Sequence, residues 1–192
     1  MKTRWKPSAT VASVVEHNGR FLLVEEHTPD GLKLNNPAGH LDPGESPVDG
    51  CVRETLEETT YTFTPTALVG VYLSRQQRRS TGTDTTYLRF AFCGTVGEAD
   101  PTRTLDRGIV RTVWMTEAQI RACPERHRSP LLLRCLEDYL AGKRYPLDLI
   151  TTDASVFTPE HLGWTRSPPG PCWAVPLLAR ACSTPLRAAA AF

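Results

Sequence analysis

Residues Gly39–Phe63 read GHLDPGESPVDGCVRETLEETTYTF and are the most informative segment of this 192-residue chain. A loop rich in glycine and proline leads into a segment that carries Glu54, Glu57 and Glu58 within five residues. On a helix these side chains share a face, where each like-charge pair costs roughly 0.2–0.5 kcal/mol. Glu57 and Glu58 also fall near the C-terminus of the predicted helix, which is the unfavourable end for negative charge. A pattern this poor for stability indicates a chemical use.

The helix is predicted from its first residues. Ser46 has the side chain of an N-cap, Pro47 suits the first helical position, and Asp49 stands where a capping box has its partner. The helix is expected to end near Thr59. Gly50 within it costs on the order of 1 kcal/mol relative to alanine, which a close backbone contact would explain. The predicted buried stripe consists of Val52, Thr55, Leu56 and Thr59.

The rest of the chain interleaves strands and helices. Residues 8–15 and 20–26 are β-prone runs around Asn18-Gly19 and predict a hairpin, followed by a polar loop at 27–33. Because this hairpin is antiparallel, a mixed sheet flanked by helices is favoured over an all-parallel one. Further expected elements are strands at 67–74, 86–96 and 108–115, a polar and basic loop at 75–85, and helices at 116–123 and from the cap Ser129 to a stop at Gly142.

Composition narrows the class of protein. The formal net charge of +1 argues against a protein that wraps nucleic acid. No apolar run approaches the roughly 18–20 residues of a membrane span, and we expect no membrane partner and no secretory signal. The six cysteines are scattered and predict reduced thiols in a cytoplasmic protein. We expect one domain over residues 1–156, followed by a tail rich in proline and alanine over 157–192, in a monomer or small homo-oligomer.

The acidic helix has two interpretations. Three glutamates alone are most often a solvated face. The flanking residues change that balance, because a glycine-rich loop feeds directly into the helix and adds Glu45, while Arg53 lies among the glutamates. A hard divalent cation requires oxygen ligands, and magnesium is usually shared between carboxylates and substrate phosphates. The segment therefore predicts a magnesium site.

The same segment closely resembles the Nudix box, G-x(5)-E-x(7)-R-E-U-x-E-E-x-G-U, where U is a bulky aliphatic residue. Thr55 and Tyr61 occupy the two U positions, and Thr60 replaces the second glycine, which usually ends the helix in a left-handed turn. The resemblance covers about residues 5–152 and is greatest to the NudJ-like phosphatase branch. The six matching positions are Gly39, Glu45, Arg53, Glu54, Glu57 and Glu58.

The resemblance implies an α+β fold, the α/β/α sandwich of Nudix hydrolases around a mixed β-sheet. It also implies hydrolysis of phosphoric anhydride bonds with Mg²⁺, or with Mn²⁺ as a substitute. Carried over, the metal ligands are Glu54, Glu57, Glu58 and the backbone carbonyl of Ala38. Arg53 orients the acidic side chains with Glu45 as its partner, and Glu57 or Glu58 serves as the catalytic base. Asp106 is a candidate further acid, with a turn aspartate as the alternative.

The substrate implied by this branch is a nucleoside triphosphate or diphosphate, and also the pyrophosphate of the thiamin pyrimidine precursor. Lys33 and Arg89 are the candidate substrate-binding residues. The alternatives are a nucleotide sugar, a dinucleotide, or a Nudix module that only binds its ligand. Further basic candidates, each with a solvated surface charge as the alternative, are Arg75, Arg78, Arg79, His127 and Arg128.

The sequence thus predicts that Glu57→Gln largely abolishes hydrolysis and leaves the fold intact, because a carboxylate ligand is lost without a change of shape. Phosphate release with magnesium present, measured beside circular dichroism of the variant, checks this. Phosphate release near the wild-type rate would contradict the assignment of Glu57 as a metal ligand.

Overall fold

A computed structural model describes residues 4–78 and 82–157 of the chain. Strand β1 (Ser8–His17) lies at the centre of the fold because it pairs with three other strands. It is antiparallel to β2 and β4 and parallel to β6, so the sheet is mixed as predicted. The other strands are β2 (Arg20–Thr28), β3 (Gly31–Asn35), β4 (Ala38–His40), β5 (Tyr61–Arg78), β6 (Thr83–Ala99) and β7 (Ile109–Thr116).

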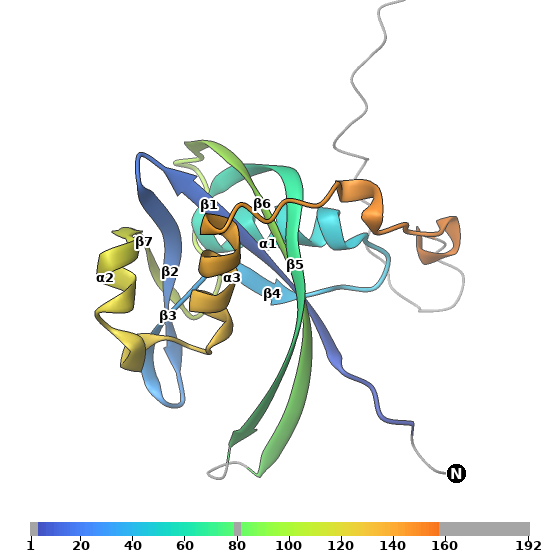
Figure 1. Cartoon of the computed structure of the whole chain (residues 1–192), viewed down its shortest axis with the longest axis horizontal. Coiled ribbons are helices and arrows are strands. Elements are labelled where there is room, and N and C mark those ends of the chain that lie inside the picture. Colours follow the sequence, from blue (N-terminus) through green and yellow to red (C-terminus); the bar gives the residue numbers. More distant parts are fainter. Residues whose placement is uncertain (1–3, 79–81, 158–192) are drawn as a thin grey trace, which may run out of the picture.

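Helices cover both faces of the sheet, as Figure 1 shows. Helix α1 (Pro47–Thr59) packs on one face, where Val11, Leu22 and Phe92 form a buried cluster with Cys51. Helices α2 (Glu117–Arg121) and α3 (Leu131–Leu140) bring Ile120 and other apolar residues into a second buried cluster on the opposite face. This arrangement is the predicted α/β/α sandwich.

The β1–β2 hairpin forms as predicted. Asn18 and Gly19 have φ angles of 52° and 73°, the positive pair that a two-residue hairpin turn of type I′ requires. Three short 3₁₀ helices complete the described chain, η1 (Pro124–Arg126), η2 (Leu147–Leu149) and η3 (Ala154–Phe157). The predicted tail beyond Phe157 lies outside the described residues. No helix in the described part is long and apolar enough to span a bilayer.

Two predicted loops are wrong. Residues 75–85 mostly belong to the long β5–β6 ribbon, which extends beyond the body of the sheet in Figure 1. The polar composition hid these strands, whose side chains bond one another across the ribbon: Arg75 Nε donates to Asp84 at 2.8 Å. Residues 27–33 likewise form the end of β2 and the start of β3, and the short strand β4 was not predicted.

Helix α1 has the predicted ends but a different buried face. Ser46 Oγ accepts a hydrogen bond from the Asp49 N–H at 3.1 Å, and the Asp49 carboxylate accepts one from the Ser46 hydroxyl. The helix buries Cys51, Thr55, Glu58 and Thr59, whereas Val52 and Leu56 are only half-buried. The predicted stripe is therefore right for Thr55 and Thr59, wrong for Val52 and Leu56, and missed the burial of Cys51 and Glu58.

Two departures from helical preference have local explanations. Thr55 is buried with its hydroxyl satisfied, since it donates to the Cys51 carbonyl at 2.7 Å. A Cβ at Gly50 would lie 2.7 Å from Glu45 Oε1 and 3.0 Å from Leu41 Cδ1. The close approach at Gly50 therefore comes from the ends of two side chains rather than from the expected backbone contact, and a larger residue would displace them.

The other helices begin close to their predicted positions. Thr116 and Gln119 form a complete capping box at α2. Helix α3 starts at Leu131, one residue after Pro130, and the Ser129 hydroxyl accepts a hydrogen bond from the Leu131 N–H. Gly142 has a φ of 78° just after the end of α3, which suits a stop signal.

Thr60 keeps the left-handed turn without a glycine. Its φ is 63° and its N–H donates to the Leu56 carbonyl at 2.9 Å, so the helix ends as a glycine would end it. A β-branched residue in this conformation is strained, at a cost of roughly 1–2 kcal/mol.

We therefore predict that Thr60→Gly raises the free energy of unfolding by about 1 kcal/mol, the relief of strain being partly offset by a more flexible unfolded chain. Thr60→Ala is the matched control, because it removes the branch but keeps a Cβ in the left-handed region. Urea unfolding of the three proteins measures the difference. A Thr60→Gly variant less stable than Thr60→Ala would contradict the strain argument.

Candidate active site

Arg53 is the centre of the hydrogen bonds around the acidic helix. Its Nε and Nη2 donate to the two carboxylate oxygens of Glu45 at 2.9 and 2.8 Å. Its Nη1 donates to Glu54 Oε1 at 2.8 Å and to Glu57 Oε2 at 2.9 Å. Nη2 also donates to the His40 carbonyl at 2.9 Å. The hydrogen bonds to Glu45 are the largest cause of the raised pKa of Arg53. The predicted pairing of Arg53 with Glu45 is thus present.

Strand β4 lies directly against the carboxylates of α1. The Ala38 N–H donates to Glu58 Oε2 at 2.8 Å. A Cβ at Gly39 would lie 2.1 Å from the carboxyl carbon of Glu54, so any larger residue would displace that side chain. The first glycine of the motif therefore makes room for a glutamate. It brings the backbone of β4 beside two of the predicted metal ligands.

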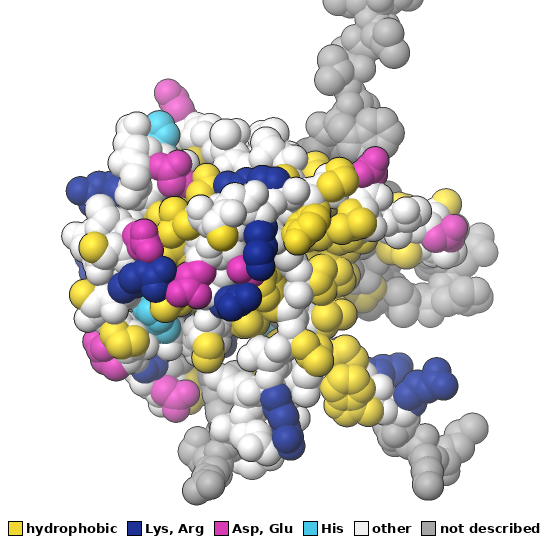
Figure 2. Space-filling model, in the orientation of Figure 1, with side chains coloured by type: hydrophobic (Ala, Val, Ile, Leu, Met, Phe, Trp, Pro, Cys, Tyr) yellow, Lys and Arg dark blue, Asp and Glu magenta, His cyan; other side chains and the backbone are white. Residues whose placement is uncertain are grey.

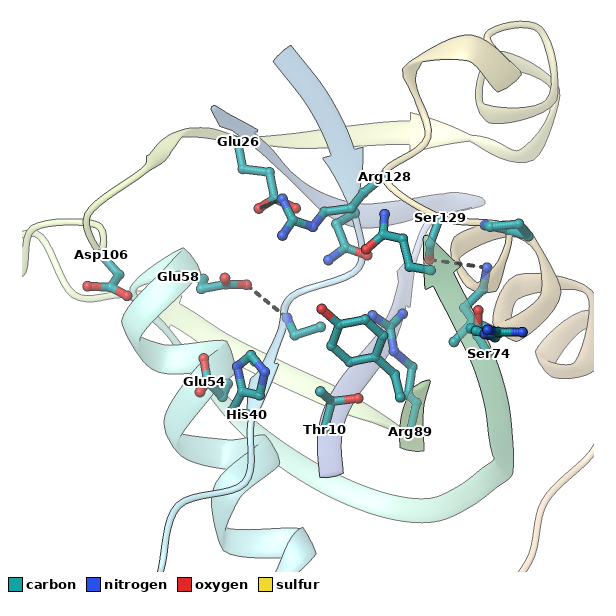
Figure 3. Close-up of a pocket in the computed structure, with 18 residues that line it drawn as sticks. Thr10, Glu26, His40, Glu54, Glu58, Ser74, Arg89, Asp106, Arg128 and Ser129 are labelled. Atoms are coloured by element: carbon teal, nitrogen blue, oxygen red, sulfur yellow. Dashed lines mark hydrogen bonds and ion pairs between the residues drawn. The ribbon is translucent and has the colours of Figure 1, made fainter. Parts of the chain in front are cut away.

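These groups face a cavity of about 370 Å³, shown in Figure 3. Glu54, Glu58 and Asp106 line one side, and Ala38 is also among the lining residues. Arg89 and Thr10 lie on strands β6 and β1, opposite the helix. The backbone N–H of Asp106 donates to the Glu57 carbonyl at 2.9 Å, which fixes the loop before β7 to the end of the helix.

Glu58 is a buried carboxyl, only 8% exposed. Burial is the largest cause that raises its pKa, to about 8. The Ala38 N–H acts in the opposite direction, and the charges of Glu54, Glu26 and Asp106 raise the pKa further. Without a metal, the neighbouring carboxylates therefore oppose the ionisation of Glu58. A cation among them would favour the ionised form of each.

Arg89 is the opposite case, a guanidinium that is 8% exposed. Burial is the largest cause that lowers its pKa. Its Nε and Nη1 have no hydrogen-bond partner among the described residues. Buried N–H groups are normally paired, so two unpaired ones beside a cavity indicate that a ligand supplies the acceptors. The candidate substrate-binding role of Arg89 fits this position.

The structure brings some predicted residues to the cavity and leaves others outside. Arg75 and Arg128 line it, although Arg75 pairs with Asp84 and Arg128 with Glu26. Glu57 is half-exposed, held by Arg53, and is not among the lining residues.

Lys33 does not reach the cavity. Its ammonium donates to the Glu125 carbonyl at 2.7 Å, so nothing here supports substrate binding by Lys33. His127 is also outside, with its Nε2 2.9 Å from the Ile120 carbonyl. The side chain of Arg78 and all of Arg79 lie outside the described residues.

Several lining residues were missed by the sequence analysis. Glu26 lies at the end of the VEE run in β2, and Thr10, Asn35, His40 and Tyr87 come from four other places in the chain. The sequence held a signal for two of these residues. Asn35 follows the polar segment that was mistaken for a loop, and His40 lies inside the recognised motif.

The residues around the cavity fit a divalent cation. Within residues 4–78 and 82–157, no three His, Cys, Asp or Glu side chains stand close enough to form a ready-made metal cage. Magnesium does not require one, because it usually keeps several waters and shares one or two carboxylates with substrate phosphates. Glu54 and Glu58 supply carboxylates, and the destabilised charge of Glu58 is one that a cation would neutralise.

Known proteins with similar sequences and structures identify the family of this chain. The NUDIX domain family model matches residues 4–134. Phosphatase NudJ of Escherichia coli strain K12 is 34% identical over 146 residues, which cover 76% of this chain and 92% of the relative. A NUDIX hydrolase of known structure from Nitrosomonas europaea is 52% identical with a TM-score of 0.70, covering 77% of this chain and 98% of that one. The structure of a UDP-X diphosphatase shares the fold, with a TM-score of 0.58. It is only 18% identical, and the match covers 76% of this chain and 68% of that one.

Fold and relatives together define the class: this protein is a hydrolase that acts on phosphoric anhydride bonds. The chain belongs to the Nudix family, and the predicted resemblance to that family and to its NudJ-like branch is confirmed.

The burial of Glu58 predicts how stability depends on pH without metal. The ordinary pKa of 4.5 applies to the unfolded chain, and the folded pKa is about 8. Between these values the folded protein holds a proton that the unfolded chain releases, so the free energy of unfolding falls as pH rises from about 5 to about 8. Glu58→Gln should remove this fall and add on the order of 1–3 kcal/mol at pH 8.

Urea unfolding in the presence of a chelator, at several pH values, measures this dependence. Glu57→Gln is the matched control, since it changes a half-exposed glutamate one residue away and should keep the wild-type dependence. The same pH dependence in Glu58→Gln and wild type would show that Glu58 is not the group responsible.

Proposed function

We propose that the protein is a Mg²⁺-dependent hydrolase of nucleoside triphosphates and diphosphates, with the phosphates bound between Arg89 and the carboxylates of α1. The observation that carries the proposal is the buried guanidinium of Arg89, with two unpaired N–H groups at the cavity. Phosphate is one of the anions that a guanidinium binds well, through charge-assisted hydrogen bonds to its oxygens. A neutral ligand would add no negative charge beside this buried guanidinium.

The carboxylates across the cavity support the same assignment. Glu54, Glu58 and the carbonyl of Ala38 would hold the metal, with Glu57 as a further ligand through its place on the same helix. When bound, Mg²⁺ offsets charge on the phosphate oxygens and lowers the pKa of a coordinated water. Arg53 keeps Glu54 and Glu57 in place through its hydrogen bonds.

The chain also supplies groups that can accept a proton. Glu54, Glu58 and Asp106 present carboxylates to one cavity, so a proton lost by the attacking water has an acceptor in whichever of them does not bind metal. Asp106 fits as a further acid because it lines the cavity, although its Oδ1 also accepts the Arg107 N–H as a turn aspartate does. Arg128 adds positive charge near the phosphates.

A substrate panel tests the proposal. Nucleoside triphosphates, nucleoside diphosphates, the thiamin pyrimidine pyrophosphate, a nucleotide sugar and a dinucleotide would each be incubated with Mg²⁺, with Mn²⁺ and with a chelator. Orthophosphate, pyrophosphate and mononucleotide would be resolved as products. Hydrolysis of the nucleotide sugar or dinucleotide alone would overturn the proposed substrate class, and binding without hydrolysis of any of them would favour a module that only binds its ligand.

Arg89 also gives a prediction in which stability and activity change in opposite directions. Arg89→Met keeps the length of the side chain but removes a buried, unpaired charge, so it should raise the free energy of unfolding without substrate by about 1 kcal/mol or more. The same change should raise KM for the nucleotide at least about 10-fold, because a hydrogen-bonded charge pair with phosphate is lost.

Arg103→Met is the matched control. Arg103 is half-exposed, pairs only with Asp100 among the described residues, and does not line the cavity. Steady-state kinetics and urea unfolding measure both quantities. An Arg89→Met protein that is less stable yet has an unchanged KM would show that Arg89 serves the fold rather than the substrate.

A further inference from the structure

Two aromatic side chains meet at the cavity beside the phosphate site. The ring centroids of His40 and Tyr87 are 6.2 Å apart and their planes are tilted by 51°. Both residues line the cavity; His40 is exposed and Tyr87 is half-buried. Rings at this tilt do not stack face to face, so neither ring covers the whole face of the other.

Sheet pairing explains how these residues come together. Thr10 of β1 lies opposite His40 of β4 on one side and opposite Arg89 of β6 on the other. Tyr87 precedes Arg89 by two residues on β6, so both side chains point to the same face, roughly 7 Å apart along the strand. The aromatic pair therefore lies next to the guanidinium of Arg89, which binds the phosphates in the proposed function.

The same part of the cavity contains buried polar atoms without a partner. Thr10 Oγ1 and Asn35 Oδ1 make no hydrogen bond within the described chain, and their residues are only 6% and 4% exposed. Both residues line the cavity. Buried hydroxyl and amide oxygens normally have partners, so these two indicate a ligand with polar atoms on its edge.

We propose that His40 and Tyr87 form the site for an aromatic heterocycle carried by the substrate, with Thr10 and Asn35 available to its polar edge. The inference rests on the proposed function, because it takes the phosphates to lie at Arg89. A ring with a polar edge, joined to phosphates by a short linker, matches both the aromatic faces and the unpaired oxygens. A sugar or a bare polyphosphate could bond the unpaired oxygens but would have no ring to place against the aromatic faces.

Two substrates share this chemistry: a nucleobase joined through ribose, and a pyrimidine joined through one carbon. The test compares wild type with Tyr87→Leu, which removes the ring but keeps apolar volume, and with Tyr87→Phe, which keeps the ring. KM is measured for a nucleoside triphosphate and for the pyrimidine pyrophosphate. The inhibition constant of magnesium tripolyphosphate, which has no ring, is measured beside them.

Tyr87→Leu should raise KM for the ring-bearing substrate about 5-fold or more, the usual effect of losing one base–aromatic contact. The inhibition constant of tripolyphosphate should not change, and Tyr87→Phe should restore KM. An increase for only one of the two substrates identifies the linker that the site accepts. Tyr145→Leu is the matched control, because this half-exposed tyrosine lies outside the cavity and should leave all constants at wild-type values.

Two results would overturn the inference. An unchanged KM in Tyr87→Leu would show that no ring lies there, and equal increases in KM and in the tripolyphosphate constant would show a general structural role. Both presuppose an active wild-type enzyme. Absence of hydrolysis by wild type with Mg²⁺ would instead refute the proposed function.

Discussion

The interaction on which the rest of the site depends is the set of hydrogen bonds made by one guanidinium. Arg53 binds Glu45 with two parallel bonds, separates Glu54 from Glu57, and reaches the carbonyl of His40. It thereby joins a loop, a helix and a strand, and it holds together the carboxylates of the loop and the helix, which would otherwise repel one another. Only arginine has enough donors in a fixed plane for this task, since lysine is a point charge with no fork. The cavity wall follows from that geometry.

Across the cavity the protein keeps two ions in unfavourable surroundings. Burial raises the pKa of Glu58 to about 8 and lowers that of Arg89, so each group is less easily charged than in water. Within the described chain Glu58 accepts a hydrogen bond from the backbone N–H of Ala38, and two nitrogens of Arg89 have no hydrogen-bond partner. A metal ion beside Glu58 and a phosphate beside Arg89 would give each of these groups an opposite charge. The fold gives up stability here, a trade that functional sites commonly show.

The sequence predicts the part of the site that lies on one helix. It does not predict the part that is assembled from paired strands, for a physical reason. Glu54, Glu58 and Arg53 lie on one helix, so their spacing alone places them together, and the caps at Ser46 and Thr116 mark helix starts locally. Thr10 meets Arg89 and Tyr87 only through the pairing of β1 with β6, which no local pattern encodes. The outer part of the β5–β6 ribbon, predicted as a loop over 75–85, was missed because polar side chains bond one another across it. The buried face of α1 was predicted only in part: Thr55 and Thr59 are buried as expected, but the burial of Glu58, which faces the cavity, was not foreseen.

The hydrogen bonds of Arg53 also bear on how this chain can vary in length. Surface loops usually accept extra residues, because each doubling of a loop costs only about 0.6 kcal/mol in closure entropy. The loop that contains Glu45 lies on the surface, yet both of its ends are tied to Arg53, through the His40 carbonyl and the Glu45 carboxylate. The side chains of Glu45 and Leu41 also pack closely against the helix at Gly50. An inserted residue would therefore have to break an ion pair or bulge outward, which makes this short exposed segment as intolerant of insertions as the interior of a strand.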